Sequence, residues 1–368
     1  MKILRISPSF ASVEFPGSGL NAYYHAINSS DKNLILTEFK QATYMPVPSN
    51  VRIMPIKINN ISLGRPGKFN SFRVINFYKK LLSTIKFFLL AKNEINQFTP
   101  DIVHLYTPIH LICGLYCKFK FKSKLVVSLH GTDVLRISAS FFYKIILNLC
   151  DSILLLSHKM EDDLSLNHKD ISYIGNGFDN KIFNYKENID RKKFILTVGN
   201  LRWQKDHQSL IKAFSSFIKK HPEYMLIVVG AGVLEDELKK LAFLEGISDL
   251  IDFKGKLPSS DISELMQQSD FFVLSSVSEG SPKVILEAMS CGLPIVSTSV
   301  GDVPKLIKGY GLSCFASNPL LLSNTMSECV DLCKKINRKE ISDSVSSRSW
   351  QNITRSLEEK YTKLISND

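Results

Sequence analysis

The chain has 368 residues, of which 44% are hydrophobic, and carries a formal net charge of +11 at pH 7. This length exceeds one ordinary hydrophobic core and predicts two domains of about 180 residues each, while the composition excludes an intrinsically disordered chain. No apolar run reaches the roughly 20 uninterrupted residues that a membrane-spanning helix needs. The seven cysteines lack the paired spacing of a zinc site, which favours free thiols in a reducing cytosol.

The first half of the chain predicts strands that alternate with helices. The first strand is expected at residues 2–7, whose apolar stretch is too short for a signal peptide. Gly17 and Gly19 separate this strand from a helix that begins at about Leu20, and they either let the backbone approach a ligand or form a simple turn. Further strands are expected at 33–37, 51–55, 100–106, 125–130 and 152–157. This alternation predicts a parallel sheet.

His130 stands at the carboxyl end of the strand expected at 125–130. Ligands of open parallel sheets bind at this edge, so a histidine there is either a site residue or a structural one. Asp133 follows in the same polar loop, where it either faces the crevice or caps the next helix. We retain His130 as a candidate site residue.

The excess positive charge is concentrated in residues 51–124, which hold 13 basic residues and only Glu94 and Asp101 as acids. Lysines lie beside apolar side chains at 72–92 and at 118–124. This pattern predicts a helix face that lies on an anionic membrane, with roughly 1 kcal/mol of attraction per basic residue. A solvated basic face is one alternative. Nucleic acid is another, and it is disfavoured because no known nucleic-acid-binding motif accompanies the charge.

The second half predicts another parallel α/β domain after a polar linker at 184–192. Arg202 and Lys205 lie between its first strand and a helix from about Gln208. Their cations can meet one pyrophosphate or can be ordinary surface charges. Gly230-x-Gly232 matches a dinucleotide fingerprint only in part, because a glutamate replaces the third small residue. Strands are expected at 194–199, 225–230, 252–255, 270–276 and 293–298.

The most informative stretch is EGSPKVILE at residues 279–287. Its first glutamate lies in the loop after a buried strand. Ser281 is predicted to cap a helix in which Pro282 occupies the first position and after which Gly292 follows. The N–H groups at the start of such a helix suit a phosphate. Glu279 and Glu287 can accept hydrogen bonds from hydroxyl groups on either side of it. The alternative is a solvated Glu279 and a surface pair between Glu287 and Lys283.

This stretch resembles the donor-site signature of the family-4 retaining glycosyltransferases, and the resemblance extends over nearly the whole chain. It implies the α/β fold called GT-B, with two doubly wound Rossmann-like domains facing each other across a cleft. The N-terminal domain, which binds the acceptor, is expected at residues 1–183 with a C-terminal helix at 350–368. The domain that binds the nucleotide-sugar is expected at residues 190–349.

The resemblance implies catalytic roles for Glu279, His130, Lys205 and Arg202. The two cations neutralise the departing diphosphate, Glu279 holds the donor sugar, and His130 orients that sugar. Glu287 holds the ribose. The expected donor-binding residues are Gly17, Gly19, Arg202, Lys205, Leu257, Glu279, Gly280, Ser281, Pro282, Lys283, Val284 and Glu287. The chain departs from the family at Gly17-Ser-Gly19, where adjacent glycines are usual, and at Lys305, where a glutamate is common.

No DxD pair occurs in the sequence, so neither a metal nor a cofactor is expected. The resemblance implies attack on the donor with retention, during which the leaving phosphate takes the acceptor proton. The predicted enzyme transfers a sugar from a nucleoside diphosphate-sugar, such as a UDP-sugar, to a glycan or polyprenyl-linked acceptor. Its expected role is the synthesis of O-antigen, capsule or lipopolysaccharide on the inner face of the cytoplasmic membrane.

Three other functions fit parts of the sequence. A nucleotide-sugar epimerase shares the expected architecture and would convert the donor without an acceptor. An NAD-dependent dehydrogenase is disfavoured by the incomplete glycine fingerprint at Gly230 and Gly232. A non-catalytic nucleotide-binding protein would not need the four candidate catalytic residues together.

Overall fold

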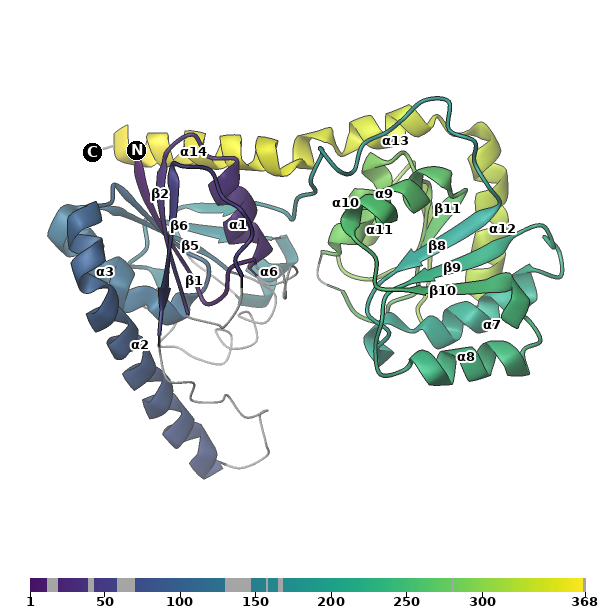
Figure 1. The fold of residues 1–368 in the computed structure, drawn as a ribbon, viewed down its shortest axis with the longest axis horizontal. Helices are drawn as coiled ribbons and strands as arrows, with labels where there is room; N and C mark the ends of the chain where they lie inside the picture. The colour runs from purple at the N-terminus through teal and green to yellow at the C-terminus, as the bar shows by residue number, and fades with distance from the viewer. Residues whose placement is uncertain are drawn as a thin grey trace. The chain divides into compact units, whose positions relative to one another are not determined.

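The computed structural model describes residues 1–11, 19–38, 43–57, 70–129, 147–156, 158–164, 168–279 and 281–366. The chain divides into two compact units (Figure 1). Unit 1 consists of Met1–Gly175 together with Trp350–Asp368, and unit 2 consists of Asn176–Ser349. The last helix of the chain therefore belongs to the same unit as the first strand.

The described part of unit 1 contains a seven-stranded parallel sheet with the order β3-β2-β1-β4-β5-β6-β7. The chain adds β2 and then β3 on one side of β1. From β4 onward, it adds each new strand on the other side of β1. The five inner strands of this order are almost wholly buried because helices cover both faces, as is usual for parallel sheets, whereas the two edge strands are partly exposed. In chain order they are β1 (Lys2–Ser7), β2 (Lys32–Glu38), β3 (Val51–Ile56), β4 (Ile102–Leu105), β5 (Lys124–Ser128), β6 (Ser152–Leu155) and β7 (Ile171–Tyr173).

Successive side chains of β1 point to opposite faces of the sheet and meet different helices. Leu4 packs in a core with α2, α3 and α6, whereas Ile3 packs with Leu357 and Tyr361 of α14. None of the helices within the described ranges combines the length and apolar character needed to cross a membrane. The helices of unit 1 are α1 (Leu20–Ile27), α2 (Asn70–Phe98), η1 (Pro108–His110), α3 (Leu111–Phe121), α6 (His158–Leu164) and α14 (Trp350–Ser366).

Unit 2 contains a six-stranded parallel sheet, among its described residues, with the order β10-β9-β8-β11-β12-β13. Its two hydrophobic cores lie on opposite faces: Ile195 belongs to the core with α7, α8 and α12, and Leu196 to the core with α9, α10 and α13. The strands are β8 (Phe194–Val198), β9 (Met225–Val229), β10 (Ile251–Gly255), β11 (Phe271–Leu274), β12 (Ile295–Thr298) and β13 (Gly311–Cys314).

The helices of unit 2 fill the connections between these strands. They are η2 (Trp203–Lys205), α7 (His207–Phe217), α8 (Glu235–Leu244), η3 (Ser248–Leu250), α9 (Ser259–Gln268), α10 (Lys283–Ser290), α11 (Val303–Leu306), α12 (Pro319–Lys335), α13 (Arg338–Ser344) and η4 (Ser346–Arg348). Both halves of the chain thus form the doubly wound parallel sheets predicted from the sequence.

The structure corrects two local expectations and supports two others. Ser281 does not cap α10, because Pro282 is the residue at the cap position and no side chain makes a capping hydrogen bond there. Pro282 is not the first residue of α10: its φ of −72° and ψ of 116° are extended, and the helix begins at Lys283. Gly292 follows the end of α10 with a φ of 76°, a conformation that favours glycine. All seven cysteines are free.

Candidate functional site

The sheet of unit 2 changes its direction of winding between β8 and β11. These two strands pair with each other, yet the chain continues from β8 to β9 on one side and from β11 to β12 on the other. The connections that leave their carboxyl ends therefore diverge, and ligands of such sheets bind in the crevice that results. Arg202, Lys205 and Glu279 all lie in the loops that follow β8 and β11.

Lys205 and Glu279 form an ion pair across these two loops. The Nζ atom of Lys205 lies 2.5 Å from Oε1 of Glu279. The hydroxyl of Ser276 donates a hydrogen bond of 2.9 Å to the same carboxylate oxygen. The side chains keep 23% and 16% of their surface exposed, so a ligand in the crevice has access to both charges.

Hydrogen bonds to backbone carbonyls fix the positions of the two loops that carry this pair. The N–H of Val277 donates to the carbonyl of Gln204 at 2.9 Å, and the hydroxyl of Ser275 donates to the carbonyl of Lys205 at 2.8 Å. On the other side, the hydroxyl of Thr298 donates to the carbonyl of Ser276 at 2.5 Å. The charged groups are therefore held on a supported backbone, as a preorganised binding site requires.

Three glycines allow the connections after β8 and β9 to pack closely. A side chain on Gly230, whose φ is 140°, would bring Cβ within 1.9 Å of the Gly199 carbonyl oxygen. A Cβ on Gly232 would lie 2.2 Å from the carbonyl oxygen of Leu201. Gly199 itself faces Lys205, whose Cε would be 3.3 Å from an added Cβ. Gly230 and Gly232 thus have a packing role that needs no dinucleotide.

The second glutamate of the sequence motif lies in α10, one helical turn beyond Lys283. Both side chains are partly buried, so the pair is not the fully exposed one considered from the sequence. Burial raises the pKa of Glu287 to about 7, and the Lys283 ammonium opposes this rise. Burial likewise lowers the pKa of Lys283 to about 8, against the attraction of Glu287. Near neutral pH, Glu287 can therefore act as a hydrogen-bond acceptor or, when protonated, as a donor.

The start of α10 is anchored to the beginning of unit 2. The side-chain amide of Asn176 donates to the carbonyl of Ser281 at 2.6 Å. Val284 and Leu257, two expected donor-binding residues, are half-buried against the same hydrophobic core. The amino end of α10 carries a partial positive charge that favours an anion. Asn176 was not identified as a candidate from the sequence, because nothing local indicates its contact with Ser281.

Two further side chains near Lys205 were not predicted. Asp206 adopts a φ of 46° and caps α7 by accepting a hydrogen bond from the Ser209 N–H at 3.2 Å. His207 is buried, and burial with a smaller contribution from Lys205 lowers its pKa to about 4. Its imidazole is therefore neutral at physiological pH and adds no charge to the site. The Asp before an apolar-periodic helix was a detectable capping pattern.

The remaining predicted residues divide into three groups. Arg202 is exposed at the start of η2, and its side chain makes no hydrogen bond or ion pair with any residue that the structure describes. Gly19 precedes α1 with a φ of 70°, and a Cβ there would lie 2.2 Å from the carbonyl oxygen of Ser9, so the turn itself requires glycine. His130, Gly17 and Gly280 lie outside the described residues.

Two family models match the chain. Residues 63–181 match the model for Glycosyltransferase Family 4, and residues 179–332 match the model for Glycosyl transferases group 1. Together the two matches extend over residues 63–332, and they support the resemblance to glycosyltransferases that the sequence carries.

A curated relative and two solved structures illustrate the range of similar glycosyltransferases. N-acetyl-alpha-D-glucosaminyl L-malate synthase from Bacillus anthracis is 28% identical over 228 residues, which span 56% of this chain and 59% of the relative. Sucrose-phosphate synthase from Thermosynechococcus elongatus has a TM-score of 0.77 at 15% identity and full coverage of both chains. Anabaena HepE in complex with UDP-glucose has a TM-score of 0.69 at 17% identity, covering 99% of this chain and 100% of HepE. The structural similarity confirms the predicted GT-B fold.

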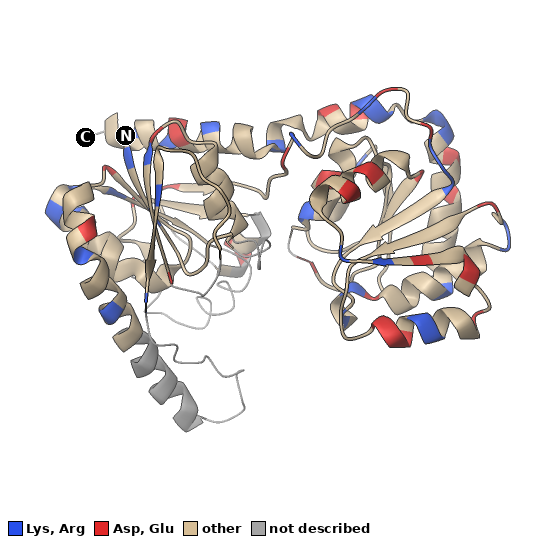
Figure 2. Cartoon of the chain, viewed as in Figure 1, with Lys and Arg blue, Asp and Glu red and all other residues tan. Residues whose placement is uncertain are grey.

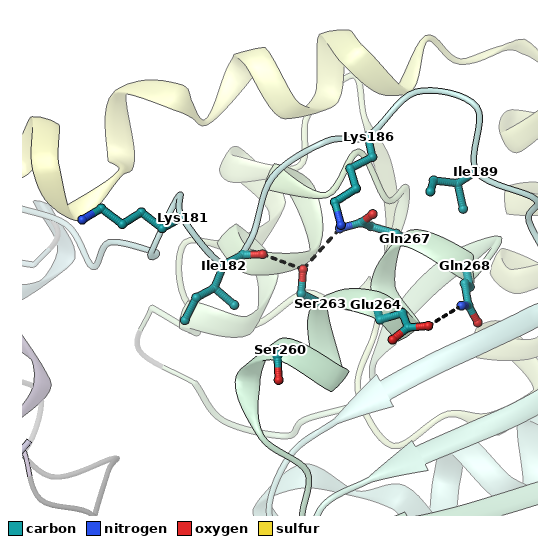
Figure 3. Close-up of a pocket in the computed structure, with 9 residues that line it drawn as sticks. All are labelled: Lys181, Ile182, Lys186, Ile189, Ser260, Ser263, Glu264, Gln267 and Gln268. Carbon is teal, nitrogen blue, oxygen red and sulfur yellow. Dashed lines mark hydrogen bonds between the residues drawn. The ribbon is translucent and has the colours of Figure 1, made fainter.

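Unit 2 also contains a cavity of about 460 Å³ (Figure 3). Ser263 of α9 donates to the carbonyl of Ile182 at 2.7 Å, which holds the chain just before the linker against the helix. The cavity wall contains none of the expected donor-binding residues. The linker that lines the cavity leads into the amino end of β8, whereas Lys205 follows the carboxyl end of that strand. The lining residues are Lys181, Ile182, Lys186, Ile189, Ser260, Ser263, Glu264, Gln267 and Gln268.

The described part of the chain contains no group of three or more His, Cys, Asp or Glu side chains arranged to hold a metal ion. The charged groups at the carboxyl edge of the β8–β11 pair include the cations of Arg202 and Lys205 and the carboxylate of Glu279. This arrangement can bind an anion and a hydroxylated ring at adjacent positions.

Proposed function

We propose that the chain transfers a sugar from a nucleoside diphosphate-sugar to a glycan or lipid-linked sugar acceptor. The observation that carries this proposal is the ion pair between Lys205 and Glu279, 2.5 Å apart at the winding switch of the sheet in unit 2. It sets a cation of the kind that binds phosphate beside a carboxylate of the kind that accepts hydrogen bonds from hydroxyls, which supports the proposal together with the matches to glycosyltransferase models. In this proposal residues 190–349 bind the donor, and residues 1–183 with 350–368 bind the acceptor.

The ion pair suggests how donor binding prepares the site. The pyrophosphate of the donor competes with Glu279 for the ammonium of Lys205, because both are anions. When the phosphate binds Lys205, Glu279 is released from the pair and accepts hydrogen bonds from the sugar hydroxyls. Arg202, which is exposed and has no ion-pair partner among the described residues, then adds a second cation to the phosphate.

Glu287 is assigned to the ribose. Its partial burial raises its pKa to about 7. Hydrogen bonds from two ribose hydroxyls stabilise the carboxylate form and lower that pKa. Donor binding is therefore expected to release a proton near neutral pH. His130, which lies outside the described residues, is assigned to the donor sugar.

The proposed reaction retains the configuration of the sugar. The acceptor hydroxyl forms a bond to the anomeric carbon on the face from which the diphosphate departs, while the bond between that carbon and the phosphate oxygen breaks. The proton of the acceptor hydroxyl passes to the leaving phosphate. Lys205, Arg202 and the amino end of α10 stabilise the negative charge on the diphosphate. Neither a metal nor a cofactor takes part in this scheme.

The proposed acceptor is a polyprenyl-linked sugar or a growing glycan of the bacterial surface, in O-antigen, capsule or lipopolysaccharide synthesis. The support for this choice is the basic, partly apolar character of the first unit, which suits a substrate carried on a membrane. The proposed location is the cytoplasm, at the inner face of the cytoplasmic membrane.

The first test is a thermal-shift panel with UDP, GDP, ADP and NAD on the wild-type chain and on Glu287→Ala. UDP is placed first because HepE was solved with UDP-glucose. A stabilising shift with one diphosphate, weakened in Glu287→Ala, supports the donor site. A shift with NAD alone overturns it.

Transfer is then measured with the matching donor-sugar and acceptor for Glu279→Ala, Lys205→Ala and Lys212→Ala, the last being an exposed lysine of α7. Activity lost in the first two and kept in the third supports the assignment. Near-normal rates in all variants contradict it. Conversion of donor-sugar in the absence of acceptor identifies an epimerase instead, and donor binding without turnover identifies a binding protein.

A further inference from the structure

The solvent-facing side of α2 is apolar over residues 82–90. Phe87 and Ala91 on the opposite side are fully buried in the core of unit 1. The outward side carries four large apolar residues, which we call the apolar stripe: Leu82, Ile85, Leu89 and Leu90, with 62%, 38%, 62% and 48% of their surface exposed. Their spacing of three and four residues places them along one face of the helix. This segment is therefore apolar on two sides, although only one of them packs against protein.

Lysines border the apolar stripe and extend to α3. Lys86 is exposed within the stripe itself. Lys92 of α2 and Lys120 of α3 converge on the ring of Tyr116, at 5.8 Å and 5.3 Å from its centre. Close to them on α3, Phe119 has 76% of its surface exposed. Figure 2 shows basic residues along both helices.

Few acidic groups offset this charge. Residues 82–124 contain six lysines and two acids, Glu94 and Asp101. The carboxylate of Glu94 is already paired with Arg52 at 2.5 Å. The surface that combines the apolar stripe with Lys86, Lys92 and Lys120 is therefore positively charged.

We propose that the apolar stripe of α2 enters the headgroup region of an anionic lipid bilayer, with its lysines contacting the lipid phosphates. A bilayer surface provides a partner for both kinds of side chain. The acyl chains bury the leucines, and the anionic headgroups attract the lysines. Long lysine side chains can lie along the apolar surface while their ammonium groups reach the headgroups. The helix lies in the membrane surface and does not cross the bilayer.

Two other occupants fit less well. A second copy of the chain, related by twofold symmetry, would bring the same basic surface against itself, because such an interface uses one patch twice. Nucleic acid supplies phosphates for the lysines but offers no apolar phase for Leu82 and Leu89. Charge complementarity together with apolar burial thus favours lipid.

Sedimentation with vesicles tests this inference in the absence of donor and acceptor, so that its result is independent of glycosyl transfer. The full chain is incubated with vesicles of phosphatidylcholine, with or without phosphatidylglycerol, at low and high salt. We expect binding only to the anionic vesicles, and weaker binding at high salt. The double variant Leu82→Gln/Leu89→Gln should bind about tenfold more weakly, and Lys86→Gln about fivefold more weakly.

The matched controls are Leu244→Gln and Lys240→Gln, which change an exposed leucine and an exposed lysine of unit 2. Both should bind like the wild type, and circular dichroism should show the same fold for every variant. Equal binding to both kinds of vesicle, or undiminished binding by the double leucine variant, overturns the proposal. Light scattering that shows a dimer of the wild type and a monomer of the leucine variant assigns the stripe to self-association instead.

Discussion

Each unit of the molecule surrounds a cation with polar side chains, but the two cations have different access to solvent. In unit 1, Arg5 of β1 has no exposed surface. Its guanidinium donates to the Asn33 side-chain oxygen at 2.7 Å, to the hydroxyls of Tyr106 at 3.0 Å and Tyr361 at 3.3 Å, and to the carbonyl of His25 at 3.2 Å. All of these acceptors are neutral. The Tyr106 hydroxyl keeps its proton because burial raises its pKa to about 12, although the nearby guanidinium opposes this rise.

The cation in unit 2 lies at the end of a strand instead of within one. Lys205 follows β8, retains 23% exposure and pairs with a carboxylate that is also partly exposed. Arg5 is enclosed by its own chain on every side, including by Tyr361 of the last helix, so its hydrogen bonds hold that helix to the sheet. The comparison shows that a buried polar cluster within a sheet stabilises the fold, whereas an accessible cluster at the carboxyl edge is available to a ligand.

The largest effect that separates the two clusters is expected from Arg5→Met. This change leaves several buried acceptors without their donor, at about 1–3 kcal/mol for each. We expect the free energy of unfolding to fall by about 4 kcal/mol, as measured by urea denaturation. Arg52→Met, which changes an exposed arginine of β3, should cost less than about 1 kcal/mol. Equal losses for both variants would contradict the role assigned to the Arg5 cluster.

Lys205→Ala should show the opposite pattern. Loss of the cation that stabilises the departing diphosphate should lower kcat/KM about a hundredfold or more. Because the ion pair with Glu279 is partly exposed, the free energy of unfolding should change by only about 1 kcal/mol. Steady-state transfer assays and urea denaturation on the same preparation test both statements. A large loss of stability with a normal rate would place Lys205 with Arg5 as a structural residue.

The fold could be predicted from the sequence because each strand is a short buried run bounded by turn residues. The strand expected at 225–230, for example, is observed as Met225–Val229. Positions in the loops were predictable to the same extent: Arg202, Lys205 and Glu279 do follow the carboxyl ends of β8 and β11.

Contacts between distant residues could not be predicted in the same way. Lys205 and Glu279 are separated by 74 positions, and sequence spacing does not say that their side chains meet. Arg5 was overlooked, although an arginine inside an apolar strand indicates a buried polar partner. One such partner, Tyr361, lies 356 positions away, and only the packing of α14 on the sheet brings the two together.

Gly199→Ala offers a finer test of the accessible cluster. The added methyl group would lie 3.3 Å from Cε of Lys205, closer than normal packing allows, so the lysine side chain must move. We expect kcat/KM to fall about tenfold, because a small displacement of a charge at the reacting phosphate weakens its effect. In a Lys205→Ala background the same change should cost little more. A full tenfold loss in both backgrounds would show that Gly199 acts independently of Lys205.

The smallest expected effect concerns Glu287 and the cost of keeping a carboxylate partly buried. Its pKa is about 7 in the folded chain and about 4.5 in its ordinary state. Between these values the folded form holds more protons than the unfolded form, so stability falls as the pH rises through this window. Glu287→Gln has no such titration. It should therefore match the wild type at about pH 4 and exceed its stability by about 1 kcal/mol near pH 7.5.

Whether Glu287→Gln is more stable than the wild type near pH 7.5 depends on Lys283. The substitution also removes the attraction between the Glu287 carboxylate and the Lys283 ammonium. Burial is the larger influence on Glu287, which is why we expect the glutamine variant to be more stable and, at the same time, weaker in donor binding. Thermal unfolding across this pH range, with and without the diphosphate that binds, measures both quantities. A variant less stable than the wild type near pH 7.5 would show that the attraction to Lys283 outweighs burial. Glu287 would then belong with Arg5 among the groups that stabilise the fold.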